Sequence, residues 1–229
     1  MSDLYFVQRA VGRMQNLAYL VGSLETRECL VVDPAWSVDA LLDQAEADGM
    51  RVAGALVTHY HQDHVGGEIF GMRIEGLPRL LERAPMPIHV NTREADGLRK
   101  VTGVSESDLV RHEGGDVLEL GGVRVRLLHT PGHTPGSQCF LVEPAGEPGS
   151  LVSGDTLFLG SCGRVDLPGG DPEALYDSLK NQLGRLPDET LLYPGHLYGD
   201  PSSTLGEQKR TNPFLRVTGL RDFLAFLGA

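Results

Sequence analysis

Residues 58–64 read Thr58-His59-Tyr60-His61-Gln62-Asp63-His64 and directly follow the apolar run at residues 52–57. Neutral imidazole and carboxylate are ligands that divalent transition metals prefer. Adjacent desolvated histidines contribute little to a fold by themselves, because burying polar atoms without partners is unfavourable. The HxHxDH pattern therefore predicts a metal site at the end of a strand.

Three further segments repeat this order of apolar strand, tight turn and ligand-type side chain. His133 lies in the Pro/Gly-rich turn at residues 130–137, Asp155 follows the apolar run that begins at Leu151, and His196 follows Pro194-Gly195. Loops at strand ends are where a rigid sheet usually presents binding and catalytic side chains. These three residues are therefore further candidates for the same site.

The composition indicates a globular protein without a nucleic-acid or membrane partner. The chain has 229 residues, and its hydrophobic fraction of 41% is enough for a sizeable core. Its 20 basic and 31 acidic residues give a formal net charge of −11, whereas nucleic acids and anionic membranes select basic surfaces. No apolar run of about 18 residues and no signal-peptide pattern is visible, and the three cysteines form no CxxC motif. We therefore expect a cytoplasmic protein.

Strand and helix patterns alternate in blocks, which predicts layered α/β packing within one domain at residues 1–229. Strands are predicted at residues 4–8, 14–21, 29–32, 52–57, 117–120, 123–128, 138–142, 151–152 and 191–193. Helices are predicted at residues 38–48, 77–83, 92–100, 173–183 and 217–227. Thr92 is a candidate N-cap for the third helix, and Asp171-Pro172 starts the fourth. Residues 66 to about 115 are expected to be more helical than the N-terminal part.

The four motifs together resemble the metallo-β-lactamase superfamily. They are HxHxDH at residues 59–64, TPGHTPGS around His133, SGDTLF around Asp155 and PGH at residues 194–196, in the expected order along nearly the whole chain. The resemblance implies an α/β fold, the four-layer αβ/βα metallo-β-lactamase sandwich. In that fold two β-sheets are flanked by helices, and the metals lie at one sheet edge.

The resemblance also implies two metal positions bridged by one carboxylate. The first position would be held by His59, His61 and His133, the second by Asp63, His64 and His196, and Asp155 would bridge them. Two divalent metal ions, foremost Zn²⁺, are the cofactors implied. Metal ions about 3.5–4 Å apart can share a hydroxide that attacks a carbonyl carbon. Asp63 would orient this nucleophile as well as bind metal.

Four more residues have structural interpretations. His89, His112 and His129 lie outside the motifs, and we expect ordinary hydrogen-bonded roles for them. Asp33 follows a predicted buried strand. It could orient a metal-bound histidine from behind, or it could stabilise a turn or cap a helix.

Residues 160–167 resemble a loop of glyoxalase II-like thioesterases and persulfide dioxygenases. In those families a basic residue at the place of Arg164 and a tyrosine at the place of Tyr198 help to bind glutathione. Arginine can bind a carboxylate through two hydrogen bonds. Arg164 could equally pair with Asp166 or Asp171. The resemblance thus implies a small-molecule substrate, with a glutathione conjugate as one candidate.

The spacing between two motifs is longer than the resemblance leads us to expect. His59 and His133 are 74 positions apart, and the surplus falls in residues 70–87. We therefore predict a helical insertion near residues 68–100 within the single domain. This segment could be a substrate lid, an extra packing helix or the surface of a homodimer.

Three functions remain open. The first is a binuclear metal-dependent hydrolase similar to glyoxalase II (hydroxyacylglutathione hydrolase), which cleaves a thioester, lactone or related ester and uses all seven ligand positions. The second is a mononuclear persulfide dioxygenase acting on glutathione persulfide, with one Fe²⁺ bound through His59, His133 and Asp155 only. The third is a noncatalytic or RNA-processing member of the fold, which the acidic charge disfavours. The complete ligand set favours the hydrolase.

Overall fold

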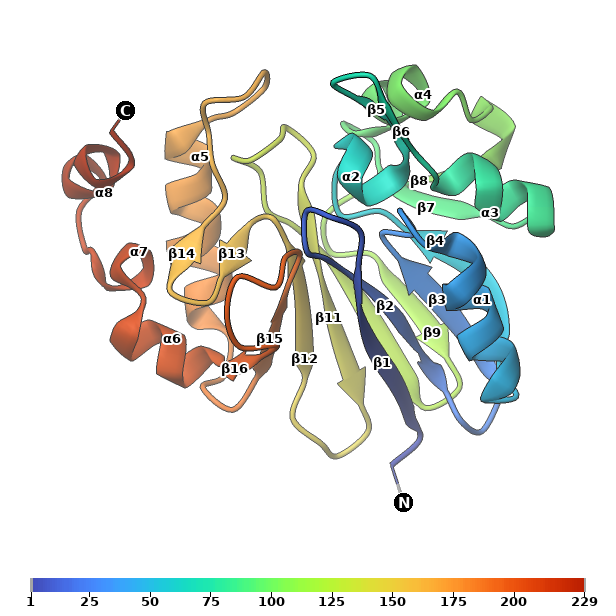
Figure 1. Cartoon of the computed structure of the whole chain (residues 1–229). Coiled ribbons are helices and arrows are strands. Elements are labelled where there is room, and N and C mark those ends of the chain that lie inside the picture. Colours follow the sequence, from blue (N-terminus) through green and yellow to red (C-terminus); the bar gives the residue numbers. More distant parts are fainter. Residues whose placement is uncertain (1, 229) are drawn as a thin grey trace.

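Two β-sheets pack face to face in the computed structural model, which describes residues 2–228, and helices cover the outer face of each sheet (Figure 1). In spatial order the first sheet contains β1 (Leu4–Val11), β2 (Asn16–Ser23), β3 (Glu28–Val32), β4 (Arg51–Leu56), β7 (Ile88–Asn91) and β8 (Leu109–His112). The second contains β16 (Ser203–Thr204), β15 (Leu191–Pro194), β12 (Ser150–Gly154), β11 (Gln138–Pro144), β10 (Val123–His129) and β9 (Val117–Leu120). The predicted four-layer αβ/βα sandwich is confirmed.

Three apolar clusters hold these layers together. The first sheet packs against α1 (Val38–Ala47), α3 (Leu77–Arg83) and α4 (Ala95–Thr102). The second sheet packs against α5 (Pro172–Asp177), α6 (Leu205–Thr211) and α8 (Leu220–Leu227). The third cluster fills the space between the sheets. Each fully buried Leu, Val or Phe in these clusters contributes roughly 1.5–3 kcal/mol relative to an exposed one.

Strand β2 shows why its sequence is apolar at nearly every position. Tyr19 and Val21 face the second sheet, whereas Ala18 and Leu20 face the helices on the opposite side. A strand that is buried on both faces does not alternate between apolar and polar residues. The apolar run around residues 17–21 therefore predicted the strand but did not show which side chains face the second sheet and which face the helices.

Strand directions bring the four motifs to one edge of the sandwich. Strand β10 is antiparallel to β11, β11 is antiparallel to β12, and β12 is parallel to β15, so the carboxyl ends of β10, β12 and β15 lie together. The backbone N–H of Gln138 donates to the carbonyl of Thr58 at 2.9 Å, which ties the loop after β4 to the second sheet. Gly154 has φ +48°, and a Cβ atom there would lie 2.7 Å from Cβ of Thr58. Glycine is therefore required where the two sheets approach each other.

The segment at residues 66–115 contains more strand than the sequence predicts. It holds the hairpin of β5 (Gly67–Ile69) and β6 (Met72–Ile74), and also β7 and β8 of the first sheet. Strands β7 and β8 have four residues each, too few for an alternating pattern to stand out. Helix α4 begins at Ala95 with Glu94 at the N-cap position, so the prediction of a helix from Thr92 is wrong. Thr92 instead donates its hydroxyl to the carbonyl of His112.

The C-terminal third also differs from the predicted elements. Asp171 caps α5 as expected, and its side chain accepts hydrogen bonds from the backbone of Glu173 and Ala174. The helix predicted at residues 217–227 begins only at Leu220, because residues 217–219 separate it from α7 (Pro213–Arg216). Helix α6 and α7 were not predicted. Within residues 2–228, no helix combines the length and apolarity that a membrane span requires.

Candidate metal centre

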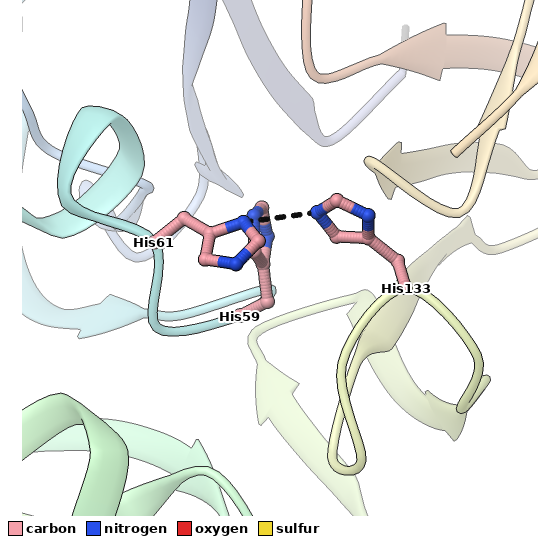
Figure 2. A group of neighbouring side chains, drawn as sticks. All are labelled: His59, His61 and His133. Carbon is pink, nitrogen blue, oxygen red and sulfur yellow. Dashed lines mark hydrogen bonds between the residues drawn. The ribbon is translucent and has the colours of Figure 1, made fainter. Parts of the chain in front are cut away.

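The first group of candidate ligands consists of His59, His61 and His133 (Figure 2). His59 and His61 lie in the loop after β4, and His133 lies in the loop after β10. One ring nitrogen from each histidine lies within 4.8 Å of the others, and Nδ1 of His61 is 3.0 Å from Nε2 of His133. His133 donates through Nδ1 to the carbonyl of Arg164 at 2.8 Å, which leaves its Nε2 facing the other two rings.

The second group consists of Asp63, His64 and His196, which also bring their ligand atoms within 4.8 Å. Asp63 and His64 lie on the short helix α2 (Gln62–Val65), and His196 follows β15. Nε2 of His196 lies 3.3 Å from Nε2 of His64 and 3.4 Å from Oδ2 of Asp63. His196 donates through Nδ1 to the carbonyl of Met14 at 2.9 Å, which directs its Nε2 into the group.

Asp155 lies between the two groups. Its Oδ2 is 3.7 Å from Nε2 of His133 in the first group and 3.5 Å from Nε2 of His196 in the second. Its Oδ1 is 3.3 Å from Nε2 of His64. A Cβ atom on Gly195 would lie 2.4 Å from this Oδ1, so the glycine of the PGH motif makes room for the carboxylate.

The two groups differ in charge when no metal is bound. Burial and the neighbouring histidines lower the pKa of His61 to about 4 and hold the pKa of His59 well below its usual range. Burial would also lower the pKa of His64 and His196, but the carboxylates of Asp155 and Asp63 outweigh it and raise the pKa of His196 to about 9. His59 and His61 therefore already have the neutral form that a metal ligand needs, whereas the protons that His64 and His196 carry leave when a cation binds.

The residues fit a metal because two buried ligand-type atoms in the centre form no hydrogen bond within the described part of the protein. Nε2 of His59 and Oδ1 of Asp155 accept no hydrogen bond from any described residue. Buried polar atoms in native proteins nearly always have partners, and the exceptions often mark an ion site. Imidazole nitrogen and carboxylate oxygen are suitable donors for zinc, iron or manganese.

Further polar residues fix the orientation of the candidate ligands. Oδ2 of Asp33 lies 2.9 Å from Nδ1 of His64, the contact expected if Asp33 orients this histidine, and the carboxylate also accepts from the backbone N–H and hydroxyl of Thr58. Asn16 donates its amide to Oδ2 of Asp63 at 2.9 Å. Nothing in the sequence indicated Asn16, because the contact joins residues 47 positions apart in different strands and loops. Such partners around a metal site set ligand orientation and affinity.

The two predicted substrate-binding residues lie on the surface. Arg164 forms two hydrogen bonds with the carboxylate of Asp166, at 2.7 and 2.6 Å, which is one of the pairings left open by the sequence. Tyr198 is 66% exposed, and its ring stacks on that of His196 with a centroid distance of 5.0 Å. Tyr198 therefore reaches the centre directly, whereas Arg164 reaches it through the backbone bond to His133.

The histidines outside the motifs have the expected hydrogen bonds. Nδ1 of His89 lies 2.9 Å from Nε2 of His112, and Nδ1 of His112 lies 2.9 Å from the carboxylate of Asp116. His129 donates to the carbonyl of Pro135. None of the three histidines belongs to a ligand group found among residues 2–228.

Comparison with known proteins agrees with this geometry. The chain belongs to the metallo-beta-lactamase superfamily, whose sequence model matches residues 11–196. It is 32% identical to hydroxyacylglutathione hydrolase GloC of Haemophilus influenzae over 83% of this chain and 89% of that protein. The crystal structure of ETHE1 from Myxococcus xanthus superposes with a TM-score of 0.81 at 28% identity, covering 98% of this chain and 90% of that one.

A third similar protein, TTHA1623, has been solved in a di-iron-bound form. It is 35% identical, with a TM-score of 0.71, and the match covers 91% of this chain and 100% of that one. The superfamily, the relatives and the assembled His/Asp groups together support an enzyme that binds divalent metal.

Proposed function

We propose that this protein is a binuclear metal-dependent hydrolase that cleaves a thioester, lactone or related ester, as glyoxalase II does. The position of Asp155 carries the proposal, because its carboxylate lies within 3.7 Å of histidines from both groups. A single metal position would leave the second group of Asp63, His64 and His196 without a role. With two metal positions, every buried ligand-type side chain in the centre would have a cation as its partner.

The chain's own residues would hold the cations and orient the reactants. Two divalent cations, most readily Zn²⁺, would supply Lewis acidity to the acyl carbonyl and to a water nucleophile. Burial would raise the pKa of Asp63, but His64 and hydrogen bonds from His196 and Asn16 hold it well below its usual range. The ionised carboxylate of Asp63 can therefore accept a hydrogen bond from the attacking water and orient it.

A glutathione conjugate is the substrate that we propose for this centre. GloC of Haemophilus influenzae, a hydroxyacylglutathione hydrolase by name, supports this class of substrate. The exposed ring of Tyr198 lies against His196, where it can contact the part of a substrate next to the scissile bond. Arg164 can bind a carboxylate of glutathione through two hydrogen bonds once it leaves Asp166.

Opposite effects of two substitutions test this role of Arg164. We expect Arg164→Ala to raise KM for a glutathione thioester about tenfold, because the loss of one hydrogen bond to a charged group weakens binding by about this factor. The kcat of the variant should stay within about twofold of that of the parent chain. Asp166→Asn frees the guanidinium, so we expect it to lower KM. Steady-state kinetics with a thioester that lacks the glutathione carboxylates is the control, since neither variant should change its KM. Equal KM values for both variants and the parent chain on the glutathione substrate would show that Arg164 forms only a surface ion pair.

A persulfide dioxygenase is the second candidate function. The structural similarity to ETHE1 over 98% of this chain favours it. One Fe²⁺ would then be held by His59, His133 and Asp155, the two-histidine, one-carboxylate set suited to oxygen chemistry. Nε2 of His59 and Oδ1 of Asp155, two buried ligand-type atoms that form no hydrogen bond, belong to that set as well.

Activity assays on two glutathione compounds distinguish the candidates. We expect the purified protein to hydrolyse a hydroxyacyl thioester of glutathione, measured as thiol release, and to consume no oxygen with glutathione persulfide. The protein loaded with Zn²⁺ and the protein loaded with Fe²⁺ are assayed side by side, so that a missing metal cannot imitate a missing activity. Oxygen consumption with persulfide by the Fe²⁺ form, without thioester hydrolysis by either form, would contradict the hydrolase.

A further inference from the structure

Glu94 is a fully buried carboxylate beside the metal centre that none of the sequence motifs contains. Its side chain is 0% exposed, and it lies immediately before α4. Burying a carboxylate is unfavourable unless its oxygens accept hydrogen bonds. Burial raises the pKa of Glu94, and the hydrogen bonds that it accepts oppose this rise. The partners of this carboxylate therefore determine what the residue does.

Three donors from two different loops meet at Glu94. Its Oε2 accepts from the backbone N–H of Tyr60 at 2.8 Å. Its Oε1 accepts from the hydroxyl of Thr134 at 2.8 Å and from the backbone N–H of Gly136 at 2.6 Å. A Cβ atom on Gly136 would lie 2.7 Å from Cγ of Glu94, so the turn packs against the glutamate too closely for any other residue.

The bonded residues are direct neighbours of the first ligand group. Tyr60 lies between His59 and His61, in the loop after a strand of the first sheet. Thr134 follows His133, in the loop after a strand of the second sheet. Figure 2 shows these two loops on opposite sides of the three imidazoles. One carboxylate thus joins the two halves of the first group across the sandwich.

The second group is oriented by other residues. Asn16 contacts Asp63, Asp33 contacts His64, and the carbonyl of Met14 accepts from His196. Glu94 forms no hydrogen bond with any of these side chains. Loss of Glu94 should therefore affect the two groups unequally.

We propose that Glu94 is a positioning residue that sets the geometry of the first metal position by holding the loop of His59 and His61 against the loop of His133. The proposal rests on the metal centre proposed above and adds to it a residue outside the ligand set. Residues that orient ligands without touching the metal commonly change metal affinity by about 10–100-fold. An effect of this size on one of two positions is not expected from general loss of stability.

The test titrates metal-free Glu94→Ala, Glu94→Gln and Thr134→Val with Co²⁺. Paramagnetically shifted N–H signals of the His133 and His196 rings in proton NMR report the first and the second group separately. Asp96→Asn is the matched control, because this carboxylate lies two residues further on, with its side chain 87% exposed and 3.3 Å from Arg111. Thermal unfolding of each metal-free variant records stability alongside affinity.

We expect Glu94→Ala to lower the Co²⁺ affinity of the first position by about 10–100-fold and to change that of the second position by less than about threefold. In Glu94→Gln the amide oxygen can still accept from Thr134 and Gly136, but the amide NH₂ group faces the backbone N–H of Tyr60 and cannot accept from it. Glu94→Gln should therefore lose less Co²⁺ affinity at the first position than Glu94→Ala. Thr134→Val removes one of the two hydrogen bonds from the other loop and keeps that of Gly136, so it should act in the same direction with a smaller effect. If Glu94→Ala does not fold, Glu94→Gln and Thr134→Val test the positioning role of Glu94.

Two results would overturn the inference. One is an unchanged Co²⁺ affinity at the first position in Glu94→Gln and Thr134→Val. The other is an equal loss of Co²⁺ affinity at both positions that parallels the loss of thermal stability. A parent chain that binds no Co²⁺ through His133 would instead refute the metal centre itself, and this inference with it. Failure of the centre and failure of the positioning role are thus separate observations.

Discussion

Asp155→Ala should lower kcat/KM for thioester hydrolysis by about 10³-fold or more. Its carboxylate contacts histidines of both ligand groups, at 3.3 to 3.7 Å from His64, His133 and His196. Stabilisation of transition-state charge by metal ions is worth several kcal/mol, and each 1.36 kcal/mol is a factor of ten in rate. Kinetics and metal analysis of the same preparation measure the effect, and metal content should fall together with activity.

The fold should survive this substitution, because Asp155 belongs to none of the three apolar clusters. Circular dichroism checks this point. Asp39→Asn is a suitable control, since that carboxylate is partly exposed and pairs with Arg79 and Arg83 of α3 on the outer face of the first sheet. Full activity with two bound metals in Asp155→Ala would show that the bridging assignment is wrong.

His196→Ala should separate the binuclear hydrolase from the mononuclear dioxygenase. In the hydrolase this substitution removes a ligand of the second position, so we expect loss of one metal and a decrease in kcat/KM of about 10²–10³-fold. In the dioxygenase His196 binds no metal, and iron content and oxygen uptake would remain close to those of the parent chain. Metal content per chain and both activities are measured on each preparation.

His112→Gln is the matched control for this experiment. His112 is nearly as buried as His196, but its ring contacts His89 and Asp116 at an edge strand of the first sheet. We expect it to keep two metals and full activity. Retention of both metals by His196→Ala would argue against the second position.

The structure brings the predicted candidate ligands together, and each of them lies in a local motif with its own turn residues. His133 in TPGHTPGS and His196 in PGH each follow a strand, and the parallel directions of β10 and β15 place both at the same edge. Local patterns therefore carried most of the information about which side chains assemble. The motifs do not show how far apart the ligand atoms lie, which depends on the approach of the two sheets.

Asn16 and Glu94, which contact the candidate ligands or their neighbours, were not predictable, since their contacts depend on tertiary packing. Asn16 reaches Asp63 across 47 positions, and Glu94 reaches Tyr60 and Thr134 across 34 and 40. Glu94 resembles any acidic residue at a helix start when only its neighbours in sequence are considered. Its hydrogen bonds to Tyr60 and Thr134 are apparent only in the folded structure, where the turn at Gly136 packs against it.

Short elements were missed for a related reason. Strands β7 and β8 have four residues each and gain their stability from neighbouring strands and from α4 rather than from a strong local pattern. The segment near residues 68–100 combines the β5–β6 hairpin, α3, β7 and most of α4. The single-domain organisation with an insertion there stays a prediction.

The most direct test of the binuclear hydrolase counts metals in the chain purified without added metal. Inductively coupled plasma mass spectrometry, referenced to protein concentration by amino-acid analysis, gives the number and identity of ions per chain. We predict two divalent ions per chain, chiefly zinc, in a preparation that hydrolyses the glutathione thioester. One iron per chain, with rapid oxygen uptake on glutathione persulfide and no second ion at Asp63, His64 and His196, would contradict this account.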